Sequence, residues 1–330
     1  MIYILFLIAA LVTIFAAVQL STYADVISEK SKWGGMMVGT ILLAGATSLP
    51  EVTASVTAVL IDSPDIAVGN VLGSNLFNIL IIGFFDLVYR KDKIFASMAR
   101  SNIYTALLGV FLTGMVFFAL IIRTDISILG IGIDSIIILL TYVIGMIAIN
   151  KFTGSNEVAA PALEAKSPVK KKSIPLKKAQ TGFLIAAVIT LIAGSALTFS
   201  GDGIATRTGI GASFVGSFLI AASTSLPEGV SVFIALKLRN YNLALGSILG
   251  SNLFNMILLT VSDIFYFKGP VIAASSQTNL ITSTAIALLS CILVYSIMRA
   301  RKKVIRYYTL PSIAIVVIYF VSSYLIFIAN

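Results

Sequence analysis

Long apolar runs, separated by short polar connections, occupy nearly the whole chain. An α-helix needs about 20 residues to cross a hydrocarbon core about 30 Å thick. Ten runs reach this length, at approximately 2–23, 35–60, 65–88, 100–122, 126–149, 180–199, 210–236, 242–266, 276–298 and 307–328. Only 11% of the residues are charged, against roughly 25% in soluble domains. The sequence therefore predicts an all-α polytopic membrane protein with ten transmembrane helices.

The 23 Lys and Arg residues are distributed unevenly between the connections. Every second connection is nearly free of them and these connections together hold only Arg123, Arg207 and Lys268, while the remaining 20 lie in the other set. Connections rich in Lys and Arg stay on the cytoplasmic side of a membrane. We therefore predict a multi-pass protein of the plasma membrane with both termini extracellular. The basic connections, including a lysine-rich linker at 150–179, are predicted to be cytoplasmic.

Two polar motifs occur twice, each time 177 residues apart. T-S-L-P-E spans residues 47–51 and 224–228, and G-S-N-L-F-N spans residues 73–78 and 250–255. Over residues 39–78 and 216–255, 18 of 40 positions are identical, and they cluster at polar and small residues. Five predicted helices, an odd number, separate the copies, so the copies enter the membrane from opposite sides. The sequence thus predicts two inverted five-helix repeats, 1–149 and 180–330, as in secondary transporters with a site near the midplane.

Each repeat places one glutamate, Glu51 or Glu228, near the middle of a predicted transmembrane helix. An ionisable side chain at this depth is costly and by default indicates a functional site. The Thr and Ser of the same motif lie on the glutamate's face of the helix, at i−4 and i−3. The intervening proline lacks an N–H and frees a backbone carbonyl that can act as a ligand. The following helix of each repeat adds a second polar set: Ser74, Asn75, Asn78, Ser251, Asn252 and Asn255.

These residues offer carboxylate, amide, hydroxyl and carbonyl oxygens. The chain contains no His, and its one cysteine, Cys291, lies in a different predicted helix. Oxygen ligands suit hard cations such as Ca²⁺ or Na⁺ and argue against Zn, Cu or Fe. Two carboxylates balance one Ca²⁺ or two Na⁺. The motifs therefore predict one site that two kinds of cation occupy in turn.

Two pairs of polar residues keep alternative interpretations at this point. Asn75 and Asn252 either belong to the site or join neighbouring helices. Asp86 and Asp263 also match at the 177-residue offset, close to predicted helix ends. They either line the ion pathway or contact water there.

Through these motifs the chain resembles the sodium/calcium exchanger family of the cation/calcium antiporter superfamily, as a prokaryotic member with two α-repeats. The resemblance implies that Glu51 and Glu228 are the central carboxylates, shared by Ca²⁺ and Na⁺. It implies further ligands around them: backbone carbonyls of Thr47 and Thr224 for Ca²⁺, Ser48, Ser74, Ser225 and Ser251 with the carbonyls of Ala44 and Ala221 for Na⁺, and Asn78 and Asn255 at the centre. It also implies that the first and sixth helices slide against the other eight.

The chain departs from the pattern of this family in two places. Ala46 and Ser223 stand where some relatives carry a glycine before Thr-Ser. Asn255 stands where several prokaryotic and potassium-dependent relatives carry Asp. The second departure removes an acid and weakens the case for potassium co-transport, but it leaves sodium/calcium exchange in place.

A calcium/proton antiporter is the main alternative, because the same two glutamates could exchange one Ca²⁺ for two protons. The uncharged oxygen side chains of the motifs favour Na⁺, since a proton does not need them. A passive channel is disfavoured, because channels generally form a pore between symmetric subunits, whereas this repeat is internal. No nucleophile–base pair or phosphate-binding loop indicates an enzyme, and the linker lacks an EF-hand pattern. The expected partners are the two ions and the lipid bilayer, with no cofactor, no nucleic acid and no obligate protein partner.

Overall fold

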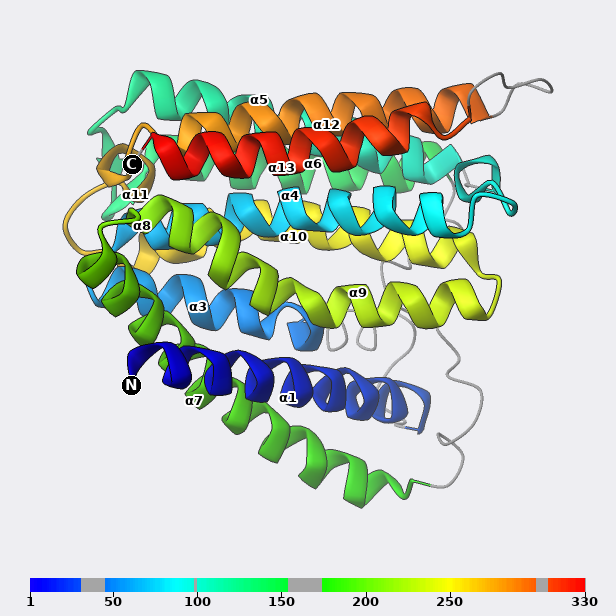
Figure 1. Ribbon diagram of the computed structural model, residues 1–330, viewed down its shortest axis with the longest axis horizontal. Coiled ribbons are helices and arrows are strands. Elements are labelled where there is room, and N and C mark those ends of the chain that lie inside the picture. Colours follow the sequence, from blue (N-terminus) through cyan, green and yellow to red (C-terminus); the bar gives the residue numbers. More distant parts are fainter. Residues whose placement is uncertain (31–44, 98–99, 154–173, 301–307, 330) are drawn as a thin grey trace.

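The computed structural model describes residues 1–30, 45–97, 100–153, 174–300 and 308–329. Its long helices are α1 (Ile2–Lys30), α4 (Pro64–Val88), α5 (Arg100–Ile122), α6 (Ile133–Thr153), α7 (Leu176–Thr208), α9 (Ala221–Lys237), α10 (Tyr241–Phe265), α12 (Asn279–Ala300) and α13 (Leu310–Ile328). The shorter elements are α3 (Leu49–Leu60), the 3-10 helix η1 (Ile94–Ser97), strands β1 (Ser127–Ile128) and β2 (Ile131–Gly132), α8 (Ala212–Phe214), the π-helix η3 (Val215–Ile220) and α11 (Val271–Ala274). Most long helices run side by side, and together they form one bundle (Figure 1).

Within the described ranges, nine helices are long and apolar enough to cross a membrane, with α8, η3 and α9 forming one continuous span, Ala212–Lys237. The second predicted helix, 35–60, is described only from residue 45 onward and contributes the shorter apolar helix α3. The predicted all-α polytopic fold is confirmed. The linker predicted at 150–179 falls largely on residues 154–173, outside the described residues.

The fifth predicted helix, 126–149, starts later than expected, because a hairpin takes up its first residues. β1 and β2 pair antiparallel, and α6 begins only at Ile133. The two residues between the strands, Leu129 and Gly130, have φ angles of 54° and 84°. Positive φ at both positions is the geometry of a two-residue turn that matches the twist of the strands.

The two copies of T-S-L-P-E have different backbone structures. In the first copy, residues 45–47 are helical, Ser48 is a turn residue, and α3 begins at Leu49 with Pro50 in its first turn. A proline is tolerated there because the first N–H groups of a helix have no partner inside it. In the second copy, Pro227 lies inside the continuous helix α9, which follows directly on η3. The predicted disturbance at proline is thus a break in the first repeat only.

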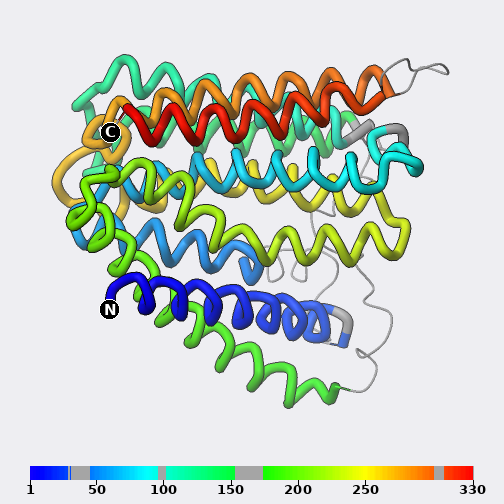
Figure 2. Tube along the Cα trace, in the orientation of Figure 1, coloured from blue at the N-terminus to red at the C-terminus, as the bar shows by residue number. Residues whose placement is uncertain are grey.

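The two ends of the bundle carry different features. Both termini lie at one end, together with α8 and α11 (Figures 1 and 2), and we call this the terminal end. The opposite end receives the C-terminal turns of α1, α9 and α12, which carry Lys30, Lys237 and Arg299. We call it the basic end. This separation agrees with the alternation of charge between the connections.

The centre of the bundle is formed by α4 and α10, the two spans with the largest buried share, 67% of the window in each. α4 also packs very closely on η3. A Cβ atom added at Gly73 would lie 2.2 Å from the carbonyl oxygen of Ser217, and one added at Gly216 would lie 2.7 Å from that of Ile66. Glycine at both positions therefore permits a backbone-to-backbone approach that a side chain would prevent.

α1 and α7 pack against each other at one edge of the bundle, and α7 runs obliquely to the other helices (Figure 1). α7 has 33 residues, which corresponds to a length of about 50 Å. A helix longer than the hydrocarbon core tilts to fit it. α7 meets α3 through hydroxyl groups: Oγ1 of Thr57 and Oγ of Ser195 are 3.0 Å apart, and Thr198 donates to the carbonyl of Ala54 at 3.4 Å.

Candidate cation site

Four asparagines join α4 and α10 where the two helices cross. Nδ2 of Asn75 donates to the carbonyl of Asn252 (3.1 Å), and Nδ2 of Asn252 donates to the carbonyl of Asn75 (3.4 Å). Nδ2 of Asn78 donates to Oδ1 of Asn252, and Nδ2 of Asn255 donates to Oδ1 of Asn75, both at 2.9 Å. Each bond has a counterpart with the repeats exchanged, as expected where equivalent surfaces meet around a two-fold axis. Asn75 and Asn252 therefore join the helices and also orient the amides of Asn78 and Asn255.

The orientation of these amides leaves two oxygens unpaired. Oδ1 of Asn78 and Oδ1 of Asn255 are buried and accept no hydrogen bond. Glu51 and Glu228 share this property: their side chains are 1% and 6% exposed, and Oε2 of each has no partner. Buried polar atoms are nearly always paired. Four unpaired oxygens at equivalent positions of two repeats, with no unpaired N–H among them, form a set that suits a cation.

The carboxylate of Glu51 is held by the second repeat. Oγ of Ser225 donates to Oε1 of Glu51 at 3.1 Å. The two glutamates are also close enough for the charge on Glu51 to act on Glu228. The charged centre is therefore assembled between the repeats, and neither repeat contains it alone.

Asn70, on α4, is a contributor that the sequence interpretation missed. Its Nδ2 donates to the carbonyl of Glu51 (3.3 Å) and to Oγ of Ser55 (2.9 Å), and its Oδ1 accepts from Thr224 (3.4 Å). It thus ties α3, α4 and α9 together beside the site. The repeat conceals it because position 247 is Ser. A buried amide one turn before Ser74, on the same face of an apolar helix, is the signal that could have found it.

The remaining predicted ligands lie around this centre. Oγ of Ser74 and Oγ1 of Thr224 are 3.5 Å apart, and Thr224 donates to the carbonyl of Ala221 at 3.2 Å. Ser48, Ser74, Thr224, Ser225 and Ala221 are buried, and Thr47 and Ser251 are half-buried. Ala44 lies outside the described residues. In the part of the chain that the structure describes, no three His, Cys, Asp or Glu side chains gather as a metal site, so the two glutamates are accompanied by neutral oxygens.

Asp86 and Asp263 do not contact water at the helix ends. Asp86 is buried and accepts hydrogen bonds from Tyr308 (2.7 Å) and Ser312. Asp263 is buried and accepts from backbone N–H groups of β2 (2.8 Å) and of Val271 in α11 (2.7 Å). Each aspartate uses both carboxylate oxygens to connect its helix to a later or earlier segment. Both residues therefore serve as structural ties in this conformation.

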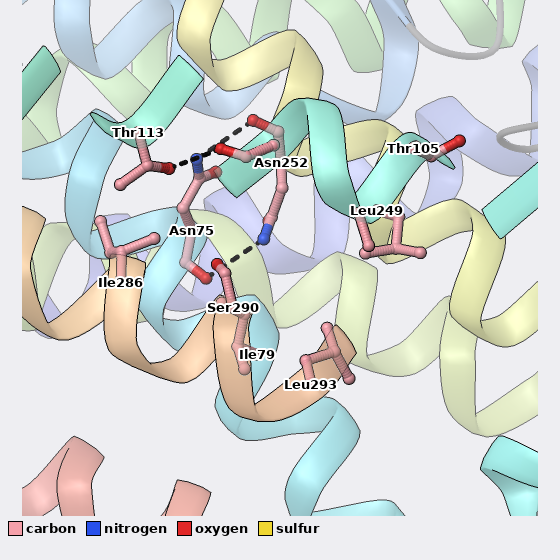
Figure 3. A pocket seen from close by; sticks show the side chains of 11 residues that line it. Asn75, Ile79, Thr105, Thr113, Leu249, Asn252, Ile286, Ser290 and Leu293 are labelled. Carbon is pink, nitrogen blue, oxygen red and sulfur yellow. Dashed lines mark hydrogen bonds between the residues drawn. The ribbon is translucent and has the colours of Figure 1, made fainter. Parts of the chain in front are cut away.

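A small cavity lies beside the asparagine pair, between α4, α5, α10 and α12 (Figure 3). Its volume of about 20 Å³ exceeds the ~10–15 Å³ that one water molecule needs on the same measure. Asn75, Asn252, Thr113 and Ser290 contribute polar groups to its wall, and none of its lining residues is charged. Thr113 and Ser290 are themselves 177 residues apart. The cavity suits water on the symmetry axis rather than a cation.

Comparison with known proteins supports the fold and the repeats. The family described as sodium/calcium exchanger protein matches residues 1–155 and 179–328. The putative antiporter CaxA of Alkalimonas amylolytica is 28% identical over 273 residues, 82% of each chain. The inner membrane protein YrbG of Escherichia coli (strain K12) is 26% identical over 257 residues, 77% of each chain.

Two solved structures share the architecture. Native YfkE superimposes with a TM-score of 0.62 at 18% identity, covering 98% of this chain and 92% of that one. The sodium-calcium exchanger NCX_Mj, soaked with Na⁺ and Ca²⁺, superimposes with a TM-score of 0.55 at 20% identity, covering 96% and 95%. The likeness extends over the whole helical bundle. Since the family match spans both repeats, this chain belongs to the sodium/calcium exchanger family.

Proposed function

We propose that this protein exchanges Ca²⁺ for Na⁺ by alternating access, through one site centred on Glu51 and Glu228. The observation that carries the proposal is the set of four unpaired buried oxygens on Glu51, Glu228, Asn78 and Asn255. The family is one of transporters rather than of enzymes. We place the protein in the plasma membrane with the basic end cytoplasmic and both termini extracellular, following the distribution of Lys and Arg.

The charge of the site explains why two ions would compete for it. Two buried carboxylates are costly unless a positive charge accompanies them. One Ca²⁺ or two Na⁺ supply that charge, and both together would exceed it. The neutral oxygens of Ser74, Ser225 and Thr224 add ligands that a dehydrated Na⁺ can use. An inward Na⁺ gradient would then drive Ca²⁺ out of the cell.

The packing of the bundle favours the pair α1 and α7 as the moving part. The two helices pack on each other and lie at the edge of the bundle (Figure 1). Where α7 meets α3, side-chain hydroxyls such as those of Thr57 and Ser195 make the polar contacts. Hydroxyl groups rotate freely and change partners readily. Sliding of this pair against the remaining helices would expose the site to each side in turn.

A calcium/proton antiporter is the second candidate, and a specific observation favours it too. An unpaired Oε2 on each glutamate can carry a proton, and a protonated carboxyl group is a hydrogen-bond donor. It could then pair with the amide oxygen of Asn78 or Asn255. Two protons would replace one Ca²⁺ with the same change of charge.

One experiment separates these candidates. The purified full chain is reconstituted into vesicles loaded with Na⁺ or with choline, and uptake of ⁴⁵Ca²⁺ is measured with and without an imposed pH gradient. We expect uptake that requires internal Na⁺. Uptake driven by the pH gradient in choline vesicles would establish proton exchange instead, and downhill uptake without any counter-ion would contradict both.

A further inference from the structure

A second group of buried polar atoms lies apart from the candidate cation site, toward the terminal end. We call it the terminal-end polar cluster; it consists of Ser213 of α8, Ser217 of η3, and Asn279, Thr282 and Ser283 of α12. All five side chains are at most 2% exposed. Four of their atoms have no hydrogen-bond partner: Oγ of Ser213, Oγ of Ser283, and both polar atoms of the Asn279 amide. So many unpaired atoms in one buried place indicate a ligand that the protein itself does not supply.

Contacts between three elements bring the members together. Oγ of Ser217 and Oγ1 of Thr282 are 3.4 Å apart, which joins η3 to α12. On α12, Asn279 lies three residues before Thr282 and four before Ser283, so the three share one side of the helix. A Cβ atom added at Gly69 of α4 would lie 3.1 Å from both the Ser213 carbonyl and the Ser217 hydroxyl. Both serines therefore face the same point on α4.

The cluster lies next to the candidate cation site along two helices. On α4, Gly73 is one turn beyond Gly69 and packs against the backbone of Ser217. On the other side, η3 continues into α9, which carries Thr224 of the site. One turn before Gly69, Asp65 accepts a hydrogen bond from the backbone of Ser276, in the connection that leads to α12. A carboxylate thus stands between the cluster and the terminal end of the bundle.

The repeat shows that this arrangement is particular to one half of the protein. Asn279 corresponds, at the 177-residue offset, to Asn102 of α5. Asn102 is paired: its Nδ2 donates to Oδ1 of Asn242 at 2.8 Å. Asn242 corresponds in turn to Asp65. One repeat thus closes its amide with a second amide, while the other leaves it unpaired and carries an acid at the equivalent position.

The composition of the cluster limits what it can bind. It offers four hydroxyl oxygens and one amide oxygen, and no carboxylate. Affinity for Ca²⁺ rises with the number of charged ligands, and a divalent ion buried among neutral groups would be left uncompensated. We propose that the terminal-end polar cluster binds one dehydrated monovalent cation on the route between the terminal end and the central site, and that it excludes Ca²⁺. The identification of that cation as Na⁺ rests on the proposed exchange.

Equilibrium binding of ²²Na⁺ to the purified full chain tests this proposal. In the double variant Glu51→Gln/Glu228→Gln the central charges are removed, so the Na⁺ that remains bound reports on the cluster. Thr282→Val is introduced in that background because it removes one hydroxyl with little change of shape. Thr284→Val is the matched control: Thr284 is exposed on the same helix, and its hydroxyl donates to the carbonyl of Leu280 in that helix.

We expect the double variant to retain one Na⁺ per chain, with a half-saturating concentration raised about tenfold, the effect of losing one typical hydrogen-bonding group, by Thr282→Val and unchanged by Thr284→Val. Asn279→Leu should abolish this binding, and if that variant does not fold, Thr282→Val decides. Loss of all ²²Na⁺ binding in the double variant would overturn the proposal. Equal Na⁺ affinity in the two threonine variants would also overturn it, as would ⁴⁵Ca²⁺ bound to the double variant. Absence of Na⁺-dependent ⁴⁵Ca²⁺ uptake by the parent protein would instead contradict the proposed exchange and leave the ²²Na⁺ result to stand on its own.

Discussion

Ser225, in the second repeat, donates its hydroxyl hydrogen to Oε1 of Glu51, in the first, at 3.1 Å. The other oxygen of the same carboxylate has no partner. The first repeat therefore supplies a charge whose orientation the second repeat sets. A displacement of one repeat against the other would change the position of this carboxylate, and this couples ion binding to conformation.

Replacement of either glutamate by its amide should remove transport while leaving the fold intact. Glu51→Gln and Glu228→Gln keep the size of the side chain but leave one carboxylate where Ca²⁺ needs two. We expect ⁴⁵Ca²⁺ uptake to fall at least tenfold, which corresponds to about 1.4 kcal/mol. Asp125→Asn, in an exposed connection, is the matched control and should transport at the parent rate. Parent-like uptake by either glutamate variant would exclude a shared site.

Loss of the Asn75 amide should weaken Ca²⁺ binding as well as the fold. Asn75→Ala removes the acceptor of Asn255 and a donor to Asn252, so the amide of Asn255 can turn its oxygen away from the site. We expect destabilisation of about 1–3 kcal/mol from unpaired buried groups, measured by thermal unfolding in detergent, together with a raised KM for Ca²⁺. Asn102→Ala breaks a similar amide pair outside the site. It should lower stability with an unchanged KM, and equal effects on KM would refute the positioning role of Asn75.

A single methyl group at Gly73 should separate α4 from η3. Its Cβ would lie 2.2 Å from a backbone oxygen, which cannot rotate away as a side chain can. We expect Gly73→Ala to cost about 3 kcal/mol, the upper part of the range for overpacking. Gly114→Ala, where a Cβ would meet nothing within 4 Å, should instead raise stability by up to about 1 kcal/mol. Thermal unfolding of the two variants checks this, and a stable Gly73→Ala protein would show that the helices can move apart without cost.

The ion pair between Asp62 and Lys268 should make a small contribution to stability that disappears in acid. The hydrogen bond and charge of Lys268 lower the pKa of Asp62 below its ordinary value of 3.8. A lowered pKa in the folded state stabilises the protein above the ordinary pKa, and the gain is lost as the pH falls through the lowered value. In Lys268→Met the pKa of Asp62, followed by carboxyl NMR, should rise toward 3.8. An unchanged pKa would mean that Lys268 does not set it.

The long helices were predictable because each had to supply an apolar stretch long enough for the membrane. Charge alternation between connections then indicated which helix ends lie together, and the offset of 177 residues indicated which residues are equivalent. The asparagine contacts between α4 and α10 follow from the same equivalence, since residues on a two-fold axis meet their own counterparts. These features depend on length, charge and repetition, all of which a single sequence displays.

The asymmetric features could not be predicted, because identical motifs sit in different surroundings. T-S-L-P-E is broken at Ser48 in one copy and continuous through Pro227 in the other, so the motif alone does not determine the backbone. Asn70 joins the site from a position that the repeat does not preserve. The hairpin before α6 occupies residues whose apolar composition also suits a helix. Tertiary contacts decide each of these cases.

The π-helix η3 sets the rotational phase between two polar layers of the protein. Ser213 precedes this segment and Glu228 follows it. Each residue of an α-helix turns the chain by about 100°, so deletion of one residue from Val215–Ile220 would rotate Ser213 by that angle relative to Glu228. The glutamate would stay where it is, while the serine would turn away from α12. The extra residue of the π turn therefore keeps both layers in phase along a single helix, and its removal would uncouple them without altering any polar side chain.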